Sequence, residues 1–333
     1  MKKRVISVLL ALTMVFAALA AMTLPASAAG AAGTFSPATA EIAMQGANIK
    51  WGAELFAQPS NVYNKDLALV SMVLSKIAHH DTEQSLNILG FENQLQIYND
   101  TDELPPFIIA HQEWTVNGVE TALILVAMQD SGASAAEWLN NLNIAIVPFY
   151  GYSVHAGFKA YADRVWAALN EFLAEHPNLP AKKKLLITGH SSGGACANLL
   201  TVRLDSDAGQ KIADKNDIYA YGFATPNLYT SKAASDGAFD NIFNTVNTAD
   251  IVPKLPANPL DPNGLLFPQW RKFGRTLTFT LTSFNGETDP HNLKIYIQGT
   301  PNASFAAEAP KFTFPALFEW LINFLRSKIT FGG

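Results

Sequence analysis

Near its middle, the chain has a short apolar run that leads directly into a Gly-x-Ser-x-Gly pattern, and this combination limits the folds that the sequence can adopt. Leu185 to Thr188 are apolar or β-branched, as in an inner strand of a covered sheet, and Gly189, Ser191 and Gly193 follow. Residues 194–204 begin with small side chains and continue with larger apolar ones, which suits a helix packed closely on a sheet. A serine at a tight turn between a strand and a helix can act as a nucleophile. The pattern therefore predicts a strand, an elbow and a helix with Ser191 as candidate nucleophile, and a structural glycine turn is the alternative.

A nucleophilic serine needs a base, and the base needs a carboxylate that orients it. In hydrolases built on such an elbow the acid and then the histidine follow the serine in the chain. Of the seven histidines only His291 lies after Ser191, so chain order alone selects it. It stands in a proline-containing turn behind a strand-like stretch, Arg275 to Phe284, and loops of this kind commonly hold reactive side chains. His291 is therefore the predicted base.

Position along the predicted sheet has to select the acid, because nine aspartates and one glutamate lie between Ser191 and His291. Asp250 comes just past a predicted strand over residues 241–247 and before a segment interrupted by prolines. Reactive groups in open α/β sheets gather beyond the carboxyl ends of the strands. We therefore predict Asp250 as the acid, with Asp261 or Asp289 as the alternatives. If Asp250 has no catalytic role, it is a solvated carboxylate on a loop.

Five blocks of the chain together resemble one known family. They are residues 154–158 (VHAGF), 189–195 (GHSSGGA), 221–226 (YGFATP), 247–256 (NTADIVPKLP) and 289–291 (DPH). In order and spacing they look like successive blocks of the class 3 lipases, the fungal-type triacylglycerol lipases and their bacterial relatives. The resemblance implies an α/β-hydrolase fold, with a mostly parallel central sheet and helices on both faces. It also implies a catalytic triad of Ser191, Asp250 and His291, and hydrolysis of carboxylic esters, commonly of lipids.

The family pattern also implies an oxyanion hole with two backbone donors. Ser192, the residue after the nucleophile, supplies one donor. Ser131 supplies the other, because it stands where the family has the Ser or Thr that closes a Phe-Arg-Gly-Ser/Thr segment. The chain departs from the pattern in two places: Met128-Gln129-Asp130 stands where the family has Phe-Arg-Gly, and Ser192 replaces the usual leucine. A carboxylate at Asp130 would oppose a developing anion unless it points away or is paired, so the departures indicate an altered substrate choice or a decayed site.

Two apolar helical patterns leave alternatives open. Residues 136–142 look like the short lid helix of the family, and Trp138, Leu139 and Leu142 could form its apolar face. Hydrophobic periodicity does not distinguish a lid that opens at a lipid surface from a plain surface helix. Residues 317–326 are also strongly apolar, and their few basic residues favour a packed helix over one that lies on a membrane.

The amino-terminal end has a basic start, an apolar middle and a small-residue cleavage site, which together are typical of a signal peptide. We predict a signal peptide over residues 1–28, a flexible lead-in over residues 29–45 and a single α/β-hydrolase domain over residues 46–333 of a secreted protein. The apolar run is close to the length of a spanning helix, so an uncleaved membrane anchor is the alternative. With 333 residues, of which 49% are hydrophobic, the chain can bury a full core.

Charge and composition limit the classes of binding partner that the protein can have. Removal of the predicted signal would take away three basic residues and no acid, which changes the formal net charge from -5 to -8. An acidic protein is poorly suited to nucleic acid or strongly anionic membranes. No glycine-rich phosphate or dinucleotide motif occurs, and His79-His80-Asp81 lacks an evident third ligand, so we expect neither a cofactor nor a metal. The expected partner is a lipid or other ester substrate, with a lipid–water interface as one place of action, and the expected state is a monomer.

These observations lead to a secreted serine ester hydrolase, a triacylglycerol lipase or carboxylesterase, as the first hypothesis. Phospholipase A1 and an acyl esterase of cell-wall or plant polymers are alternatives with the same chemistry. A binding protein on a hydrolase fold whose active site has decayed is the alternative from a different class. The sole cysteine, Cys196, is interpreted as a small buried thiol, so the chain has no internal disulfide.

Overall fold

The computed structural model describes residues 39–78, 82–91, 95–98, 105–130, 145–206, 212–231, 237–257, 268–307 and 310. The chain divides into two units, Met1–Phe35 and Ser36–Gly333, and every described residue belongs to the second unit. The predicted signal peptide, lid helix and C-terminal helix lie outside the described residues, as do Ser131, Asp261 and the His79-His80-Asp81 group. The predicted domain boundaries stay predictions.

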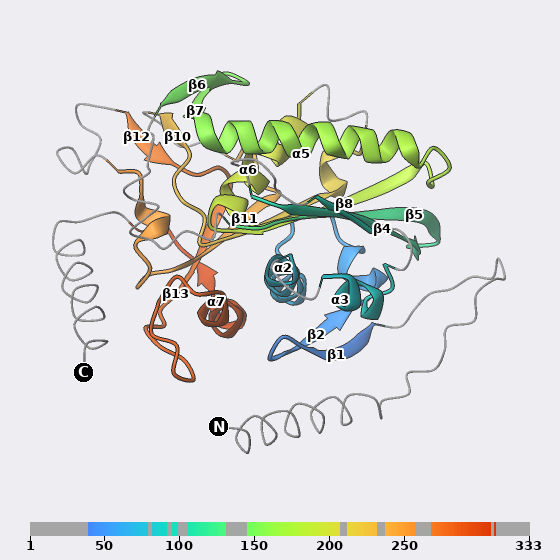
Figure 1. Cartoon of the computed structure of the whole chain (residues 1–333), viewed down its shortest axis with the longest axis horizontal. Helices are drawn as coiled ribbons and strands as arrows, with labels where there is room; N and C mark the ends of the chain where they lie inside the picture. The colour runs from blue at the N-terminus through green and yellow to red at the C-terminus, as the bar shows by residue number, and fades with distance from the viewer. Residues whose placement is uncertain are drawn as a thin grey trace, which may run out of the picture. The chain divides into compact units, whose positions relative to one another are not determined.

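An eight-stranded sheet forms the centre of this unit (Figure 1). Its strands in spatial order are β14 (Ser304–Phe305), β13 (Arg275–Phe279), β11 (Ile242–Asn247), β9 (Ile218–Phe223), β8 (Lys182–His190), β5 (Val119–Met128), β4 (Phe107–Val116) and β3 (Leu95–Tyr98). The pairs from β5 across to β13 are parallel, whereas β13–β14, β4–β5 and β3–β4 are antiparallel. Every residue of β9 and β11 is buried, as expected for parallel strands covered on both faces.

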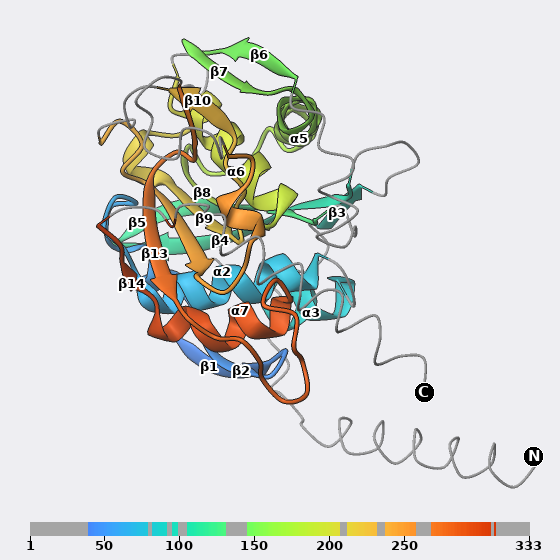
Figure 2. The same cartoon turned by 90° about the vertical axis from the view of Figure 1, so that its left-hand side faces the viewer.

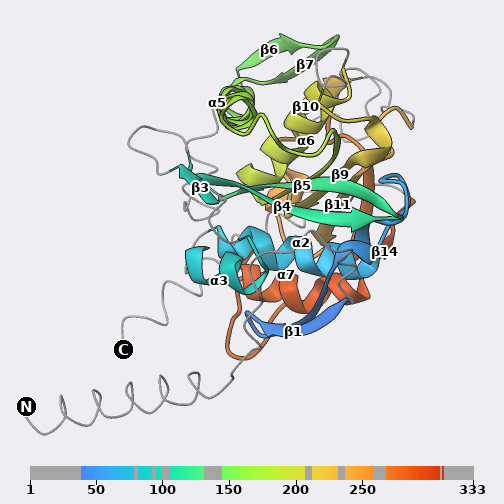
Figure 3. The same cartoon turned by 90° about the vertical axis from the view of Figure 1, so that its right-hand side faces the viewer.

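Helices cover both faces of this sheet, as Figures 1 and 3 show. One face carries α5 (Ala156–Glu175) and α6 (Ser192–Leu204), and the other carries α2 (Lys65–Ile77), α3 (Thr82–Ile88) and α7 (Leu293–Gly299). A separate hydrophobic cluster fills each interface. A mostly parallel sheet with helices on both faces and a strand–elbow–helix unit near its middle is the α/β-hydrolase fold, so the predicted fold class is confirmed.

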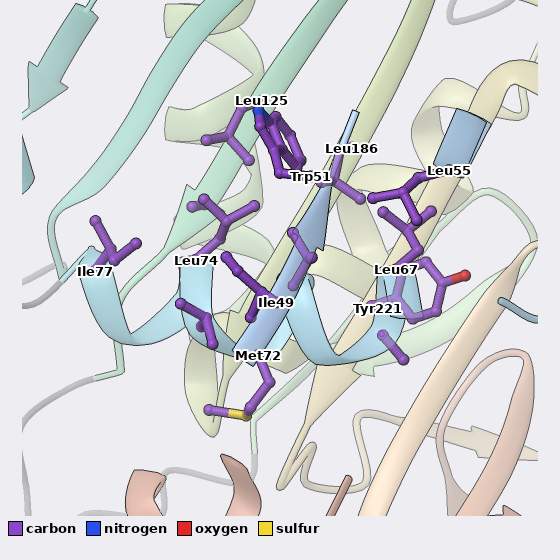
Figure 4. Close-up of a cluster of buried hydrophobic side chains, with 14 of the residues drawn as sticks. Ile49, Trp51, Leu55, Leu67, Met72, Leu74, Ile77, Leu125, Leu186 and Tyr221 are labelled. Carbon is purple, nitrogen blue, oxygen red and sulfur yellow. The ribbon is translucent and has the colours of Figure 1, made fainter. Parts of the chain in front are cut away.

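Helix α2 shows how the sequence builds one of these interfaces. The side chain of Asn64 caps its first turn by accepting the N–H groups of residues 66 and 67 at 3.0 and 3.1 Å. Leu67 and Leu74 of the helix are at most 1% exposed, and Figure 4 shows them gathered with Leu125 and Leu186 of the sheet. Burying a leucine side chain contributes about 1.5–3 kcal/mol, so this apolar face fixes α2 beneath the strands that carry the candidate site.

The described chain begins with a hairpin of β1 (Ala40–Met44) and β2 (Ala47–Trp51). Its two turn residues, Gln45 and Gly46, have φ angles of 53° and 86°, as in the two-residue turns that suit the twist of a hairpin. Ile49 is fully buried and Trp51 is 5% exposed. Residues 40–45, at the end of the predicted flexible lead-in, thus form the first strand and the first turn residue of this hairpin. Strand β1 is short, and it is held by pairing with β2 and by Met44, which is 7% exposed and belongs to the core cluster.

A second, antiparallel sheet lies next to α5, at the top of Figure 2. Its strands are β12 (Gln269–Arg271), β10 (Tyr229–Ser231), β7 (Tyr152–His155) and β6 (Ile146–Phe149).

Short 3-10 helices lie between the longer elements of the described chain. They are η1 (Ala53–Phe56), η3 (Lys215–Asp217), η4 (Val252–Lys254) and η5 (Thr300–Asn302). The strand predicted over 241–247 is β11. In the strand-like stretch predicted over 275–284, strand β13 ends at Phe279, and Phe284 forms an isolated bridge with Glu287. No helix within the described ranges is long and apolar enough to cross a membrane.

Candidate active site

Ser191 lies at the elbow between β8 and α6. Its φ and ψ angles are 56° and -122°, a conformation that costs free energy for a residue with a Cβ and that concentrates at functional sites. The N–H of Ser191 donates to the carbonyl oxygen of Phe223 on β9 at 2.8 Å, and its own carbonyl accepts the N–H of Ala195 at 3.1 Å. The turn is thus held by the neighbouring strand on one side and the first turn of α6 on the other.

The glycines around the serine are required by close backbone approach. A Cβ at Gly189 would lie 2.9 Å from the Gly194 nitrogen and would also collide with the backbone of Gly193. A Cβ at Gly193 would lie 2.8 Å from the carbonyl oxygen of Gln129 and would collide with that of Met128. The second contact sets the start of α6 directly against the end of β5. The predicted elbow, with both glycines in their predicted roles, is what the structure contains.

His291 stands between Ser191 and Asp250. Its Nε2 lies 3.0 Å from Ser191 Oγ, and its Nδ1 lies 2.7 Å from Asp250 Oδ2. Because a carboxylate only accepts, Nδ1 carries the proton of the neutral ring and Nε2 is left to accept the serine hydroxyl proton. The N–H of His291 donates to Asp289 Oδ1 at 3.0 Å, which fixes the backbone of the loop. The structure brings the three residues predicted from chain order and strand position together in the order serine, histidine, acid.

Asp250 is buried, with 2% of its surface exposed, and both carboxylate oxygens are hydrogen-bonded. Oδ1 accepts the N–H of Val252 at 2.9 Å, and Oδ2 accepts the hydroxyl of Tyr296 at 2.8 Å as well as the imidazole. Burial by itself would raise the pKa of this carboxyl, but the charge of His291 and these hydrogen bonds hold the pKa below its usual value. Asp250 is therefore ionised at neutral pH.

The interaction between Asp250 and His291 also changes the pKa of the histidine, but in the opposite direction. Burial alone would lower the pKa of His291, but the Asp250 carboxylate outweighs it and leaves this pKa raised. An imidazole with a raised pKa takes up a proton more readily, and the adjacent carboxylate stabilises the cation that results. The arrangement is therefore suited to removing the proton from Ser191.

The other candidate acids occupy different places. Asp289 accepts the backbone N–H of His291, whereas the imidazole Nδ1 is bonded to Asp250, and Asp261 lies outside the described residues. Tyr296 was not identified from the sequence. Its hydroxyl donates to Asp250 Oδ2 and accepts the N–H of Asn247 at 3.0 Å, so it links β11 to the acid. A tyrosine on a helix one turn beyond His291 carries no local signal that distinguishes it from a core residue.

One of the two predicted oxyanion donors is described. Ser192 is the first residue of α6, where a helical N–H has no acceptor in the preceding turn and can serve an external oxygen. Its hydroxyl is buried and has no hydrogen-bond partner among the described residues. Ser131, which directly follows Asp130 in the chain, lies outside the described residues. Both donor roles stay predictions.

Asp130 is paired with His190. Its Oδ2 lies 3.1 Å from His190 Nδ1, and the His190 ring is 4.8 Å from the ring of His291. Burial lowers the pKa of His190, although the hydrogen bond and the charge of Asp130 oppose this, so at neutral pH a neutral imidazole donates to a carboxylate. The Asp130 carboxylate is therefore paired through a hydrogen bond. Pairing is one of the two conditions under which a carboxylate is tolerated next to a developing anion.

The remaining predicted residues have structural surroundings. His155 caps α5, because its Nδ1 accepts the N–H of Gly157 at 3.2 Å, and Cys196 is fully buried. The described residues contain no group of three or more His, Cys, Asp or Glu side chains that could hold a metal ion.

Comparison with known proteins shows which protein family the chain is similar to. The profile described as Lipase (class 3) matches residues 125–259 of this chain. That segment belongs to the class 3 lipase family. The class 3 lipase segment includes Ser191, Ser192 and Asp250 and ends before His291, so the assignment of the histidine depends on chain order and geometry.

The chain is also similar to individual known proteins. Secreted mono- and diacylglycerol lipase 3 of Gibberella zeae is 30% identical over 197 residues, which are 54% of this chain and 57% of the relative. The chain thus spans little more than half the length of that protein. Among solved structures, lipase II from Rhizopus niveus is 16% identical with a TM-score of 0.47, covering 74% of this chain and 86% of its own. The Rhizomucor miehei triacylglyceride lipase is 19% identical with a TM-score of 0.44, covering 65% and 80%.

Proposed function

We propose that the protein is a secreted serine ester hydrolase that cleaves acylglycerols through Ser191, His291 and Asp250. The observation that carries this proposal is the position of His291, with one ring nitrogen 3.0 Å from Ser191 Oγ and the other 2.7 Å from Asp250 Oδ2. A nucleophile, a base and an orienting acid in hydrogen-bond contact are the parts that acyl transfer requires. The acylglycerol substrate is suggested by the class 3 lipase segment and by the mono- and diacylglycerol lipase of Gibberella zeae.

In the first half of the reaction, Ser191 Oγ attacks the ester carbonyl carbon while its proton passes to His291 Nε2. Asp250 stabilises the imidazolium through the Nδ1 hydrogen bond. The N–H groups of Ser192 and Ser131 donate hydrogen bonds to the carbonyl oxygen and stabilise the negative charge that develops on it. The intermediate then collapses, the bond between the carbonyl carbon and the ester oxygen breaks, and His291 returns its proton to the leaving alcohol.

In the second half, a water molecule takes the place of the alcohol. His291 removes a proton from this water as its oxygen attacks the acyl-enzyme, and a second oxyanion forms at the same donors. Collapse breaks the bond to Ser191 Oγ, which recovers its proton from His291, and the fatty acid leaves. No step requires a group other than the side chains and backbone donors named above.

The central test compares the protein with Ser191→Ala in hydrolysis of p-nitrophenyl butyrate and p-nitrophenyl palmitate. Loss of the nucleophile in a serine triad lowers kcat by about 10⁶-fold, so the variant should retain almost none of the activity of the unaltered protein. A fluorophosphonate probe should label the protein once per chain and leave Ser191→Ala unlabelled. Equal ester hydrolysis by the two proteins would contradict an enzyme at this site and would favour a binding protein on a decayed hydrolase fold.

The substrate class is tested separately. We expect the protein to release fatty acid from emulsified monoolein and diolein, with triolein included in the same series. Phosphatidylcholine and acetylated xylan test the phospholipase A1 and polymer esterase alternatives. If either of those is hydrolysed with a higher kcat/KM than every acylglycerol, the acylglycerol assignment fails although the serine hydrolase assignment stands.

Export is the third part of the proposal. The basic and apolar amino-terminal sequence suggests it, and the relative from Gibberella zeae is named a secreted protein. Expression of the full chain in a bacterial host should yield a culture-medium or periplasmic form whose amino terminus begins after residue 28. An intact amino terminus in a membrane fraction would instead support the uncleaved anchor.

A further inference from the structure

Lys272 is a buried lysine whose hydrogen-bond acceptors are uncharged. It follows β12, only 7% of its surface is exposed, and its Nζ donates to Asn227 Oδ1 and to the carbonyl oxygen of Pro253, each at 2.8 Å. Among the described residues it forms no ion pair with a carboxylate. Moving an ammonium group out of water is costly unless hydrogen bonds and opposite charge compensate it. The position of this lysine therefore calls for a physical reason beyond packing.

Its two acceptors connect the lysine to the segment that carries Asp250. Pro253 lies in the short helix η4, three residues after the acid. Asn227 extends the connection, because its N–H donates to the Leu255 carbonyl at 2.7 Å and its Nδ2 donates to that of Pro256 at 3.0 Å. Three segments that are distant in the sequence, after β9, after β11 and after β12, are thus joined by one buried polar network with Lys272 at its centre.

The lysine also acts on the acid through its charge. Burial lowers the pKa of Lys272 to about 7, although the Asp250 carboxylate opposes this change. Because a Coulomb interaction is mutual, the ammonium favours the ionised form of Asp250 and opposes a second positive charge on His291. The other ionisable groups of the described chain that act on this pair are Asp130, Asp289, His190 and Tyr296.

We infer that Lys272 is a positioning residue of the Ser191, His291 and Asp250 site. Its two hydrogen bonds clamp the loop behind Asp250, and its positive charge holds the carboxylate ionised while restraining protonation of His291 at acid pH. The inference deepens the proposed ester hydrolase function and depends on it. The hydrogen bonds persist when the ammonium loses a proton, since a neutral amine still has two N–H donors, so only the charge changes with pH.

The test is the pH dependence of kcat/KM for p-nitrophenyl butyrate in Lys272→Gln and Lys272→Met. Gln can still donate to a neutral acceptor but has no charge, so it isolates the electrostatic part. Without the ammonium, His291 keeps its proton to higher pH, and the acid limb of the profile moves upward. We expect kcat/KM at about pH 5.5 to fall at least about threefold more than at about pH 8, where the lysine of the unaltered protein is largely neutral.

Lys272→Met removes the hydrogen bonds as well as the charge. We expect it to show the same displaced acid limb and, in addition, a kcat reduced at every pH with KM changed less, because the acid is held less firmly. Lys183→Met is the matched control. Its Nζ also donates to a neutral carbonyl, that of Pro180 at 3.2 Å, but it stands at the opposite end of β8 from Ser191.

Folding is checked by thermal unfolding, and the concentration of reactive serine is measured with the fluorophosphonate probe, so that rates refer to intact sites. If neither lysine variant folds, Asn227→Ala is used. It leaves the lysine in place but removes one acceptor of the ammonium, and the acid limb should again move upward. A folded Lys272→Gln or Asn227→Ala whose profile coincides with that of the unaltered protein would overturn the inference. Absence of ester hydrolysis in the unaltered protein would instead overturn the proposed function.

Discussion

The carboxylate of Asp250 collects donors from three separate places in the chain, namely His291, Tyr296 and the backbone of Val252. The first two share Oδ2, and the third holds Oδ1. A carboxylate fixed at both oxygens has one orientation, so the imidazole that it binds is fixed as well. At the scale of single residues, the candidate site is therefore defined as much by what holds the acid as by the three residues that would react.

Asp130 is the residue whose effect on the site is easiest to isolate. It contributes negative charge that raises the pKa of His291, after the larger effects of burial and Asp250. Asp130→Asn keeps a polar partner for His190 and removes the charge, so the His291 imidazolium loses its proton at lower pH. We expect the acid limb of the kcat/KM profile for p-nitrophenyl butyrate to move downward, the opposite direction from Lys272→Gln.

The amide should also relieve the oxyanion of a nearby negative charge, so kcat on the plateau should not decrease. Asp214→Asn, which changes a carboxylate whose side chain is 83% exposed, serves as the control and should leave the profile unchanged. An acid limb that moves upward in Asp130→Asn would contradict the assigned sign of its interaction with His291.

At the scale of secondary-structure elements, the contact that matters most is the one between the start of α6 and the end of β5. Gly193 makes it possible, because any side chain there would meet the carbonyl groups of Met128 and Gln129. The N–H of Ser192 and the segment that leads to Ser131 lie on the two sides of this contact. The position of the Ser192 N–H relative to the end of β5 thus depends on a helix and a strand that touch through backbone atoms.

Gly193→Ala tests this contact. The added methyl group must push α6 away from β5, and forced overpacking of this kind costs about 1–3 kcal/mol of unfolding free energy. Because misplacement of a catalytic group by 1 Å can cost about 10²-fold in rate, we expect the loss of kcat to exceed what the loss of stability explains. Urea unfolding and kcat for p-nitrophenyl butyrate measure the two effects.

The control is Gly118→Ala. It changes a glycine with φ of 78° and open space around it, so it should cost stability through backbone strain alone and leave kcat of the folded protein unchanged. If Gly193→Ala behaves in the same way as Gly118→Ala, the close approach of α6 to β5 does not control the site.

The elements that the sequence predicted well are those whose signal is local. The strand, the elbow and the helix around Ser191 follow one another within about twenty residues, and β11 ends just before Asp250, so periodicity and turn residues identify both. His291 was identified because no other histidine follows the serine. The α/β-hydrolase fold followed from the same local units together with the family resemblance.

The features that sequence reasoning missed join residues that are far apart in the chain. His190 and Asp130 are 60 positions apart, and Lys272 and Asn227 are 45 positions apart. No periodicity or turn signal links such pairs, because their proximity follows from the order of strands in the sheet. The hairpin strand at residues 40–44 was missed for a related reason, since it is stabilised by its partner strand more than by its own composition.

At the scale of the whole molecule, the partly buried Asp205 and the buried Lys272 make stability depend on pH in different ranges. Burial raises the pKa of Asp205, the C-cap of α6, to about 7, against the opposing charge of Lys215 and a hydrogen bond from Asn241. Between about pH 4 and 7 the folded state therefore holds a proton on Asp205 that the unfolded state has lost, and stability falls as pH rises. Lys272 does the reverse above about pH 7, where the unfolded state binds the extra proton.

Asp205→Asn isolates the first effect. The amide oxygen can still accept from Asn241 Nδ2, which lies 3.2 Å from Asp205 Oδ1, and the change removes a negative charge from the carboxyl end of a helix, where the helix dipole disfavours it. The variant has no carboxyl to ionise, so its advantage should appear only where the native group would be charged. We expect a gain in unfolding free energy of about 1–3 kcal/mol at about pH 8 and almost none at about pH 4.

Urea unfolding of both proteins across this pH range measures the difference, and the difference should grow mainly between about pH 4 and 7. Asp214→Asn, at an exposed carboxylate, should show no such growth. Because Asp205 lies at the far end of α6 from Ser191, kcat should be the same in both proteins, so a change in stability without a change in rate is the expected pattern. A gain that is equal at about pH 4 and about pH 8 would mean that packing at the helix end, and not the ionisation of the partly buried carboxyl, sets the stability at this position.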